Sequence, residues 1–440
     1  MNGGRSRWRQ LPPFLRWLYP GLRVKRWLLL LLLGLAIASI GTAFGIGLSN
    51  MVEITDAMMS LIGPLWATRF AAFVGAAVAA AGLACVLVAL RNLVKSVSDP
   101  LRVQDDRQLV DVLLDDRDRP RGPAVVAIGG GTGLSNLLRG LKKHTSDITA
   151  IAAVSDDGGS SGRLQREMKM LPPGDVRNCL VALADDEGLM SRLLQYRFED
   201  VPSVEGHSLG NLFIAALASI TGDFERAVKE TSKVLAIRGR VLPATLEQVT
   251  LCGRLEDGTL IRGETQVADN GGRLSEVFLD PAEPEALEEA VEAIKTADIV
   301  VIGPGSTFTS LIPNLLVPGV AQALRDTNAV RAFVCNVMTQ PGETDLLVQA
   351  SDQVRAVTEH VGGKVLDFVL INDAVPNPGV LARYEGVGAR IVEPDAEEVG
   401  RMGVIPICGD LISIDDYAWH DPDKLAPTLI RLAPVAEPVV

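Results

Sequence analysis

Residues 125–136, VVAIGGGTGLSN, constrain the fold of this chain more than any other stretch. Five apolar or small residues predict a strand that runs into Gly129, Gly130 and Gly131, and the residues after Gly133 predict a helix. A glycine turn between a strand and a helix lets backbone N–H groups approach an anion, which the helix dipole also favours. The stretch therefore predicts a phosphate-facing turn, with tight packing as the alternative explanation of its glycines.

The turn matches the common nucleotide-binding fingerprints only in part. In Gly131-x-Gly133-x-x-Asn136, asparagine stands where a dinucleotide fingerprint has its third glycine, and the G-K-[ST] ending of a P-loop is missing. The turn by itself therefore predicts a phosphate-bearing ligand without indicating NAD.

The chain after residue 122 alternates strand and helix patterns. Apolar runs that suit strands buried on both faces of a parallel sheet are 124–128, 148–154, 297–303, 330–337 and 367–372. Helical patterns are 133–143, 175–185, 188–198, 208–219, 223–236, 284–296 and 345–360. Residues 246–268 instead predict a β-hairpin around Glu256-Asp257-Gly258. The predicted fold class is α/β, a doubly wound and mostly parallel sheet with a small β-hairpin subdomain, whose ligand lies at the carboxyl ends of the strands.

Two uncharged apolar runs precede this domain. Residues 27–48 and 70–90 are each about long enough to cross a bilayer, so we expect a transmembrane hairpin over 27–90. A cleaved signal peptide is the alternative for the first run. The residues small enough for close helix contact are Gly41 and Gly45 in the first run and Gly75, Ala79 and Gly82 in the second.

The distribution of charge predicts orientation and limits the partners. The first 26 residues carry seven positive and no negative charges, whereas the loop between the runs holds Glu53 and Asp56. Both ends are therefore expected in the cytoplasm, as a two-helix protein of the cell membrane. With a net charge of −12 overall, the chain after residue 26 carries −19, which argues against a nucleic-acid partner. Five scattered cysteines without paired spacing fit a reducing compartment and no zinc site.

These observations divide the chain into five parts. They are a basic cytoplasmic arm (1–26), the hairpin (27–90), a charged linker (91–121), a nucleotide-binding domain (122–420) and a C-terminal tail (421–440).

Asp156 and Asp157 are adjacent acids where the second predicted strand ends. Because Gly158 and Gly159 follow, both carboxylates are expected to turn toward one site. Paired carboxylates near a phosphate suit Mg²⁺, and one of them could instead bind ribose hydroxyls. A helix N-cap at Ser160 or the next serine is the alternative, but it explains only a serine.

Three further polar segments follow predicted strands or begin predicted helices. In PPGDVRN, Asp175 is a predicted N-cap, and Arg177 in the first turn indicates a bound anion or, alternatively, a solvated side chain. In EGHSLGN, His207 either contacts a ligand or orders its loop. The loops GPGST (303–307) and CNVMTQPGETD (335–345) add a second glycine turn and hydrogen-bonding groups for a base or sugar.

The candidate ligand-binding residues are Gly130, Gly131, Thr132, Gly133, Ser135, Asp156, Asp157, Gly158, Gly159, Ser160, Asp175, Arg177, His207, Asn211, Gly303, Gly305, Ser306, Asn336, Thr339, Gln340, Gly342 and Glu343. Asp156 and Asp157 are also the candidate metal ligands, and no residue is assigned a catalytic role.

Six motifs in this order resemble the YvcK-like gluconeogenesis factor family, which shares a superfamily with the CofD-like 2-phospho-L-lactate transferases. They are GGGTGLSNLLRGLK, AVSDDGGSSGRL, PPGDVRNCLVALA, GHSLGNLFIAAL, IGPGSTFTSLIPNLL and CNVMTQPGETD. The resemblance covers roughly 123–419 and implies a Rossmann-like nucleotide-binding fold. It also implies a role in growth on gluconeogenic carbon sources and in cell shape, with a UDP-sugar such as UDP-N-acetylglucosamine as the ligand. The predicted membrane hairpin departs from the many soluble members of the family.

Two classes of function remain open from the sequence. The first is a nucleotide-sugar sensor that regulates envelope synthesis or carbon flux without catalysis, which the lack of an obvious nucleophile–base pair favours. The second is a transferase that uses a nucleotide diphosphate ester and Mg²⁺, which by the resemblance would be held at Asp156 and Asp157. Phosphoryl-ester transfer needs mostly positioning and charge neutralisation, which those acids would serve. A homo-oligomer and protein partners in cell-envelope synthesis are further expectations.

Overall fold

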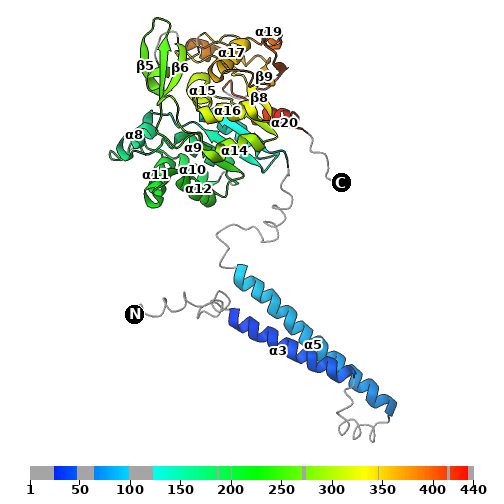
Figure 1. Cartoon of the computed structure of the whole chain (residues 1–440). Helices are drawn as coiled ribbons and strands as arrows, with labels where there is room; N and C mark the ends of the chain where they lie inside the picture. Colours follow the sequence, from blue (N-terminus) through cyan, green and yellow to red (C-terminus); the bar gives the residue numbers. More distant parts are fainter. Residues whose placement is uncertain are drawn as a thin grey trace. The chain divides into compact units, whose positions relative to one another are not determined.

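The computed structural model describes residues 24–46, 64–98, 122–185, 188–199, 201–269, 274–344, 346–413 and 417–434. They belong to two separate units, residues 1–118 and 119–440 (Figure 1). The predicted basic arm up to residue 23, the loop between the predicted spans, most of the linker and the last six residues lie outside the described residues.

The first unit contains two helices, α3 (Val24–Ile46) and α5 (Pro64–Ser98), which pack along each other (Figure 1). A Cβ atom at Gly41 would come closer than 3.0 Å to the backbone of Ala79, and one at Gly82 would do the same with Ala38. Real Cβ atoms essentially never come that close to other atoms. The predicted use of small residues for close helix contact is therefore confirmed at these positions.

The outward surface of this helix pair is apolar, with Leu32 and Ile40 of α3 and Phe73 and Leu87 of α5 exposed. Within the part of the chain that the structure describes, no single helix is long and apolar enough to cross a membrane. The apolar stretches found there in α3 and α5 are Leu32–Thr42 and Phe73–Ala89. A pair of helices joined at a sharp bend, Thr307–Leu315 and Pro318–Asp326, is together long and apolar enough to cross a membrane, judged by length and composition alone.

The second unit is built on a seven-stranded sheet in the order β10-β9-β8-β7-β1-β2-β3, whose neighbouring strands all run parallel. The strands are β1 (Val125–Gly129), β2 (Ile148–Ala152), β3 (Arg240–Pro243), β7 (Ile299–Ile302), β8 (Val330–Val334), β9 (Phe368–Asn372) and β10 (Ile405–Gly409). The chain winds from β1 toward β3 and later from β7 toward β10. The direction of winding therefore reverses between β1 and β7, which is the topological switch point.

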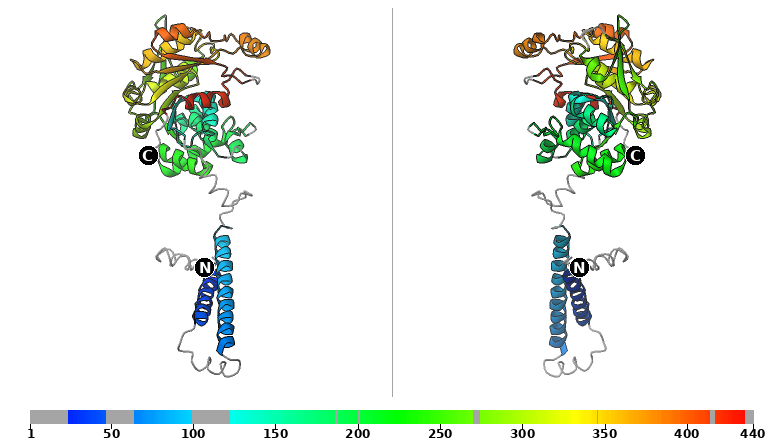
Figure 2. Two further views of the ribbon diagram at one scale, coloured as in Figure 1. Left: turned by 90° about the vertical axis from the view of Figure 1, so that its right-hand side faces the viewer. Right: turned by 90° about the vertical axis from the view of Figure 1, so that its left-hand side faces the viewer.

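Helices cover both faces of this sheet, as expected when right-handed crossovers run in opposite directions from the switch point (Figure 1, Figure 2). One contiguous set is α7 (Gly131–Leu141), α9 (Gly174–Leu183), α12 (Phe224–Leu235) and α20 (Pro422–Ile430). The other is α14 (Glu288–Thr296), α15 (Ile312–Leu315), α16 (Pro318–Asp326), α17 (Ala350–Val361) and α19 (Ala396–Arg401). Every residue of β1, β2 and β7 is buried, which explains their apolar runs without alternation.

A three-stranded antiparallel sheet forms the predicted small subdomain, with the order β5-β4-β6 (Figure 1). Its strands are β4 (Thr250–Leu255), β5 (Leu260–Arg262) and β6 (Leu274–Asp280). The predicted hairpin is confirmed for β4 and β5, and Gly258 in its turn has a φ of 85°. The prediction that the hairpin extends to residue 268 is wrong, because β5 ends at Arg262 and residues 264–268 form the short helix α13 (Glu264–Ala268).

The predicted α/β fold class is confirmed, and the differences lie at edges and ends. β3 and β10 were not predicted; each contains a proline, and β10 is a half-exposed edge strand without a continuous buried face. The helix predicted from residue 345 begins at Ala350, because Gln349 and Asp352 cap each other reciprocally there.

The short helical stretch expected at the start of the C-terminal tail is present, but it packs on the domain. Helix α20 contacts α7, and Leu425, Ala426 and Leu429 are fully buried. A Cβ atom at Gly140 of α7 would meet the backbone of Pro422. The folded domain therefore continues past the boundary predicted at residue 420.

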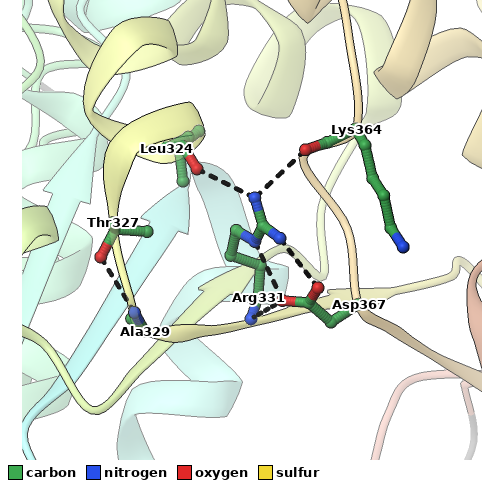
Figure 3. Close-up of polar contacts among 6 residues, drawn as sticks. All are labelled: Leu324, Thr327, Ala329, Arg331, Lys364 and Asp367. Carbon is green, nitrogen blue, oxygen red and sulfur yellow. Dashed lines mark hydrogen bonds and ion pairs between the residues drawn. The ribbon is translucent and has the colours of Figure 1, made fainter.

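At the amino ends of the strands, polar side chains join neighbouring strands (Figure 3). Arg331, at the start of β8, donates two side-chain hydrogen bonds to the Asp367 carboxylate, at 2.9 and 2.8 Å, and others to the carbonyl oxygens of Leu324 and Lys364. The Arg331 N–H also donates to Asp367, at 3.0 Å. This cluster fixes the registry of β8 and β9 at the end of the sheet opposite the switch point.

Candidate functional site

A cavity of about 310 Å³ lies at the carboxyl ends of β1, β7 and β8, beside the switch point. It is lined by Gly130, Gly131, Thr132, Gly133, Asn136, Pro304, Gly305, Ser306, Ser310, Asn336, Val337, Met338, Gln340, Tyr384, Ala418, Trp419 and His420. None of these lining residues carries a carboxylate, an ammonium or a guanidinium group. Its size and location suit a small-molecule ligand of a doubly wound sheet.

The first glycine turn connects β1 to α7 at one wall of the cavity. Gly131 adopts a φ of 62° and its N–H donates to Asp175 Oδ1 at 2.9 Å, while the N-cap residue Gly130 offers no side-chain acceptor to α7. A Cβ atom at Gly130 would collide with the Asp175 carboxylate. The glycines here thus serve close packing as well as a positive φ.

Gly133 is held by packing against the second glycine turn. A Cβ atom there would come within 3.0 Å of the carbonyl group of Pro304. Asn336, after β8, ties the same turn down by donating to the Gly305 carbonyl oxygen at 2.8 Å. The two turns and the loop after β8 therefore form one rigid wall, and for Gly133 the packing explanation is correct.

Glu343 supports that wall from behind and does not line the cavity. Its Oε1 accepts hydrogen bonds from the N–H groups of Phe308 and Thr309, at 2.9 and 3.0 Å. These residues begin the π-helix η2 (Thr307–Leu311), which follows the cavity residue Ser306. Burial raises the pKa of Glu343, and the bonds from Phe308 and Thr309 oppose that rise. Glu343 therefore caps η2.

Asp156 and Asp157 have different hydrogen-bond partners within the protein. Asp156 Oδ1 accepts from the Gly158 N–H at 2.9 Å. Asp157 Oδ1 accepts from the N–H and hydroxyl of Thr265, at 3.0 and 2.8 Å, which links it to α13 of the small subdomain. The two adjacent acids thus bond to different elements just before α8 (Gly159–Met168), while the charges of both still act on Glu264.

Acidic groups gather next to the first glycine turn. Burial raises the pKa of Asp175 to about 6, with a further contribution from the nearby Asp156 charge. Burial, followed by the Asp156 and Asp175 charges, raises the pKa of Glu264 well above its usual value. Within the described residues, no group of three or more His, Cys, Asp and Glu side chains has the geometry to hold a metal ion.

Arg177 is buried at the centre of a polar network that joins three of the predicted motifs. Its Nη1 donates to Ser208 Oγ at 2.6 Å and to Asn211 Oδ1 at 2.9 Å. Asn211 Nδ2 in turn donates to Ser160 Oγ at 3.0 Å, and Ser160 Oγ shares a hydrogen bond with His207 Nδ1 at 2.9 Å. The side chain of Arg177 is therefore neither solvated nor in the cavity lining.

This network shows how α11 (Leu209–Thr221) is attached beside α8 and α9. Ser208 is the N-cap of α11 and accepts from the Asn211 N–H. Burial lowers the pKa of Arg177 to about 10 and lowers that of His207. The motifs SDDGGSS, PGDVRN and GHSLGN thus come together as predicted, but as a packed support beneath Asp175.

The predicted site residues fall into two groups. Those that line the cavity are Gly130, Gly131, Thr132, Gly133, Gly305, Ser306, Asn336 and Gln340. The others lie outside its lining: Ser135 donates to the Gly131 carbonyl oxygen, and Thr339 exchanges hydrogen bonds with Arg390. Gly342 has a φ of 86° and approaches Ala268 closely.

The sequence interpretation missed the wall formed by Tyr384 and residues 418–420. His420 is 7% exposed; burial lowers its pKa to about 4, and its ring bonds the backbone of Cys335. Among the described residues, its Nε2 has no hydrogen-bond partner. A histidine next to the only tryptophan after residue 66 was the available signal.

Comparison with known proteins agrees with this architecture. The family model of the 2-phospho-L-lactate transferase CofD matches residues 125–412, which is most of the second unit. The chain belongs to the CofD family. A crystal structure of a Bacillus halodurans protein superimposes with a TM-score of 0.69 at 46% identity, covering 70% of this chain and 99% of that chain.

The curated relatives fall into two lengths. A protein of Bacillus subtilis named "Gluconeogenesis factor" is 46% identical over 311 residues, which cover 70% of this chain and 98% of its own. A relative from Nostoc sp. is 45% identical over 419 residues, which cover 94% of this chain and 92% of its own. The second unit thus corresponds to a whole protein in the shorter relatives, while the match to the Nostoc protein extends into the first unit.

Proposed function

We propose that this protein is a gluconeogenesis factor that binds a UDP-sugar in the cavity at the switch point and acts as a regulator. The observation that carries the proposal is the uncharged lining of that cavity, with the N-terminus of α7 at one wall. A helix N-terminus offers N–H groups and a positive dipole end to a diphosphate. Asn336, Gln340 and Ser306 offer amide and hydroxyl groups that match sugar hydroxyls.

Calorimetric titration of the full chain in detergent tests this function. UDP-N-acetylglucosamine is expected to bind at micromolar concentrations, more tightly than GDP and NAD, and to remain unchanged over hours of incubation with the protein. Absence of UDP-sugar binding at millimolar concentration would overturn the proposal, whereas tighter binding of GDP would favour the transferase class. Detergent alone, titrated with the same ligands, is the control for heats of dilution.

A transferase that uses a nucleotide diphosphate ester and Mg²⁺ is the second candidate. It is favoured by the acidic groups of Asp156, Asp175 and Glu264 beside the first glycine turn, and by the family of the chain. Carboxylates and phosphate oxygens are the ligands that Mg²⁺ prefers. Asp157 is bonded to Thr265, so Asp156 is the stronger of the two predicted ligands.

Two measurements distinguish the two classes: ligand affinity and turnover. Each is made with and without EDTA, on the wild type and on Asp156→Asn. A regulator that needs no metal binds equally well in EDTA, and the variant binds as well or more tightly because a negative charge near the ligand is lost. In a transferase, EDTA and the substitution both abolish Mg²⁺-dependent turnover.

We also propose that α3 and α5 anchor the protein in the cell membrane with both ends in the cytoplasm. Small residues at the contact between the helices and apolar residues on their outer surface support this proposal. A topology reporter inserted at residue 55 is expected to read out on the outer side, and reporters at residues 1 and 440 on the cytoplasmic side. A cytoplasmic signal at residue 55 would contradict the hairpin.

A further inference from the structure

An aromatic stack lies on the wall of the cavity that carries residues 417–420. The rings of Tyr417 and Trp419 are nearly parallel, with an interplanar angle of 16° and centroids 4.8 Å apart. The guanidinium carbon of Arg383, on α18 (Pro378–Gly386), lies 5.9 Å from the centroid of the Tyr417 ring. Tyr417 thus contacts both Arg383 and Trp419, and Trp419 lines the cavity.

The backbone fixes these rings in place. Residues 417–420 alternate, because Ala418 and His420 are buried while Tyr417 and Trp419 are 54% and 45% exposed. The Trp419 carbonyl oxygen accepts from the Ser413 N–H at 2.9 Å, and Ala418 belongs to a small apolar cluster that is separate from the main core. Trp419 is therefore a partly exposed indole on a well-anchored segment.

The same end of the cavity contains an unused hydrogen-bond acceptor. His420 lines the cavity, and its ring bonds the Cys335 backbone, while Nε2 has no partner in the part of the chain that the structure describes. Buried polar atoms without partners are rare in folded proteins, and a ligand is one of the ways in which they become satisfied. Trp419 and His420 together form an end of the cavity that differs from the glycine turns, since it offers a flat aromatic surface and an acceptor.

We propose that Trp419 is the stacking platform for the heteroaromatic base of the nucleotide, whose phosphates face the glycine turns. This inference rests on the proposed function, and it divides the ligand between the two ends of the cavity. Every nucleobase has an aromatic face, and stacking on an aromatic side chain contributes about 1–3 kcal/mol per base. Tyr417, which is stacked on the indole, holds it in the orientation that stacking needs.

The experiment compares ligands with and without a base on the full chain in detergent. The ligands are UDP-N-acetylglucosamine and N-acetylglucosamine 1-phosphate, and the variants are Trp419→Leu and the conservative Trp419→Phe. We expect Trp419→Leu to weaken binding of the UDP-sugar about 5- to 100-fold. Binding of the base-free sugar phosphate should stay within about 2-fold of wild type, and Trp419→Phe should retain most of the affinity for the UDP-sugar.

Tryptophan fluorescence gives a second readout, because Trp419 is the only tryptophan after residue 66. Stacking of uracil on the indole should quench part of the wild-type emission, and the quenching should disappear in Trp419→Phe although that variant still binds. If Trp419→Leu does not fold, judged by circular dichroism, this difference between the wild type and Trp419→Phe remains the test.

Each outcome bears on a distinct claim. Normal UDP-sugar affinity in folded Trp419→Leu, or an equal loss for both ligands, would overturn the stacking platform and leave the proposed function intact. Binding by the wild type without any change in Trp419 emission would also overturn the platform. A wild-type protein that binds no UDP-sugar would instead overturn the proposed function, and the platform with it.

Discussion

The two ends of the parallel sheet differ in whether their buried polar groups have hydrogen-bond partners. At the amino ends, Arg331 is bonded to Asp367 and to two carbonyl oxygens, and Asp298 accepts from the Ala124 N–H at 2.7 Å. At the carboxyl ends lie the buried side-chain atoms that have no partner within the described residues: Ser155 Oγ, Arg177 Nε, Asn314 Oδ1, Asp395 Oδ2 and His420 Nε2. The cavity and the buried acids Asp175 and Glu343 are also there.

This difference shows which end of the sheet is arranged for stability and which for binding. Polar groups that are satisfied within the protein stabilise the fold, whereas unpaired or charged buried groups cost stability and persist where a ligand uses them. Substitutions at the amino ends should therefore lower stability without changing ligand affinity. Substitutions of the unpaired or charged buried groups at the carboxyl ends should instead change ligand affinity.

The largest expected effect is that of Arg331→Ala at the amino ends. The side chains of Arg331 and Asp367 are 14% and 30% exposed, so the loss of Arg331 leaves a partly buried carboxylate without its cation. We expect the free energy of unfolding to fall by about 3 kcal/mol in urea denaturation, because several hydrogen bonds to charged groups are lost together. UDP-sugar affinity of the folded variant should not change.

The matched control is Arg401→Ala, whose ion pairs with Glu397 and Glu398 involve a side chain that is 69% exposed. Exposed pairs contribute about 0–1 kcal/mol, so this variant should resemble the wild type. If both variants lost the same free energy of unfolding, the Arg331 cluster would stabilise the fold no more than a surface ion pair does.

The second prediction concerns Asp175 at the carboxyl ends, where a substitution should raise stability instead of lowering it. Its pKa of about 6 is above the usual value of 3.8, so the favourable protonated form is lost as pH rises through this range. Above pH 6 the buried charge costs on the order of 2–3 kcal/mol. Asp175→Asn should therefore raise the free energy of unfolding at pH 7 while reducing or altering ligand affinity. A loss of stability at pH 7 would show that the charged form is needed for folding.

The third prediction concerns the pH dependence that arises from His420. Its pKa is about 4 when folded and 6.5 ordinarily, so below pH 6.5 the unfolded chain binds a proton that the folded chain does not. Stability from this group is present above pH 6.5 and is lost as pH falls toward 4, by about 2 kcal/mol between pH 6.5 and 5. His420→Gln should remove this slope in thermal unfolding measured over that range. Parallel pH profiles for the two proteins would contradict the assignment.

The smallest expected effect is a difference in the stability that two glycines of the first turn lose on substitution by alanine. Gly131 has a φ of 62° but open space around a Cβ atom, so Gly131→Ala should cost about 1 kcal/mol of stability. Gly133→Ala should cost clearly more, because its Cβ atom would collide with Pro304. Chemical denaturation of both variants checks the order, and a reversed order would mean that the second turn moves readily away.

The same comparison explains how much the sequence could predict. Fully buried parallel strands such as β1, β2 and β7 are recognisable in the sequence as apolar runs. The motifs that follow these strands were correctly expected to lie at one end of the sheet. The direction of individual side chains was not predictable. Asp156 and Asp157 are identical in sequence terms, yet one faces Gly158 and the other faces Thr265 of a distant subdomain.

The wall of Tyr384, Trp419 and His420 could not be predicted for a related reason. Tyr384 lies on α18, before β10, and Trp419 and His420 lie between β10 and α20, which docks on α7. None of the three directly follows a buried strand pattern. Local patterns indicate elements, whereas such a wall depends on long-range packing. Arg177 was misread similarly, since its partners come from the distant α11.

Hydrogen exchange of the full chain, with and without UDP-N-acetylglucosamine, tests the central claim most directly. The account predicts slower exchange on ligand addition at residues 130–134, 304–311, 336–340 and 417–420, with no change at the amino ends around residues 124–126, 329–332 and 366–368. Protection at the amino ends, or none at the glycine turns while the ligand is bound, would contradict the claim that the carboxyl ends of the sheet hold the nucleotide sugar.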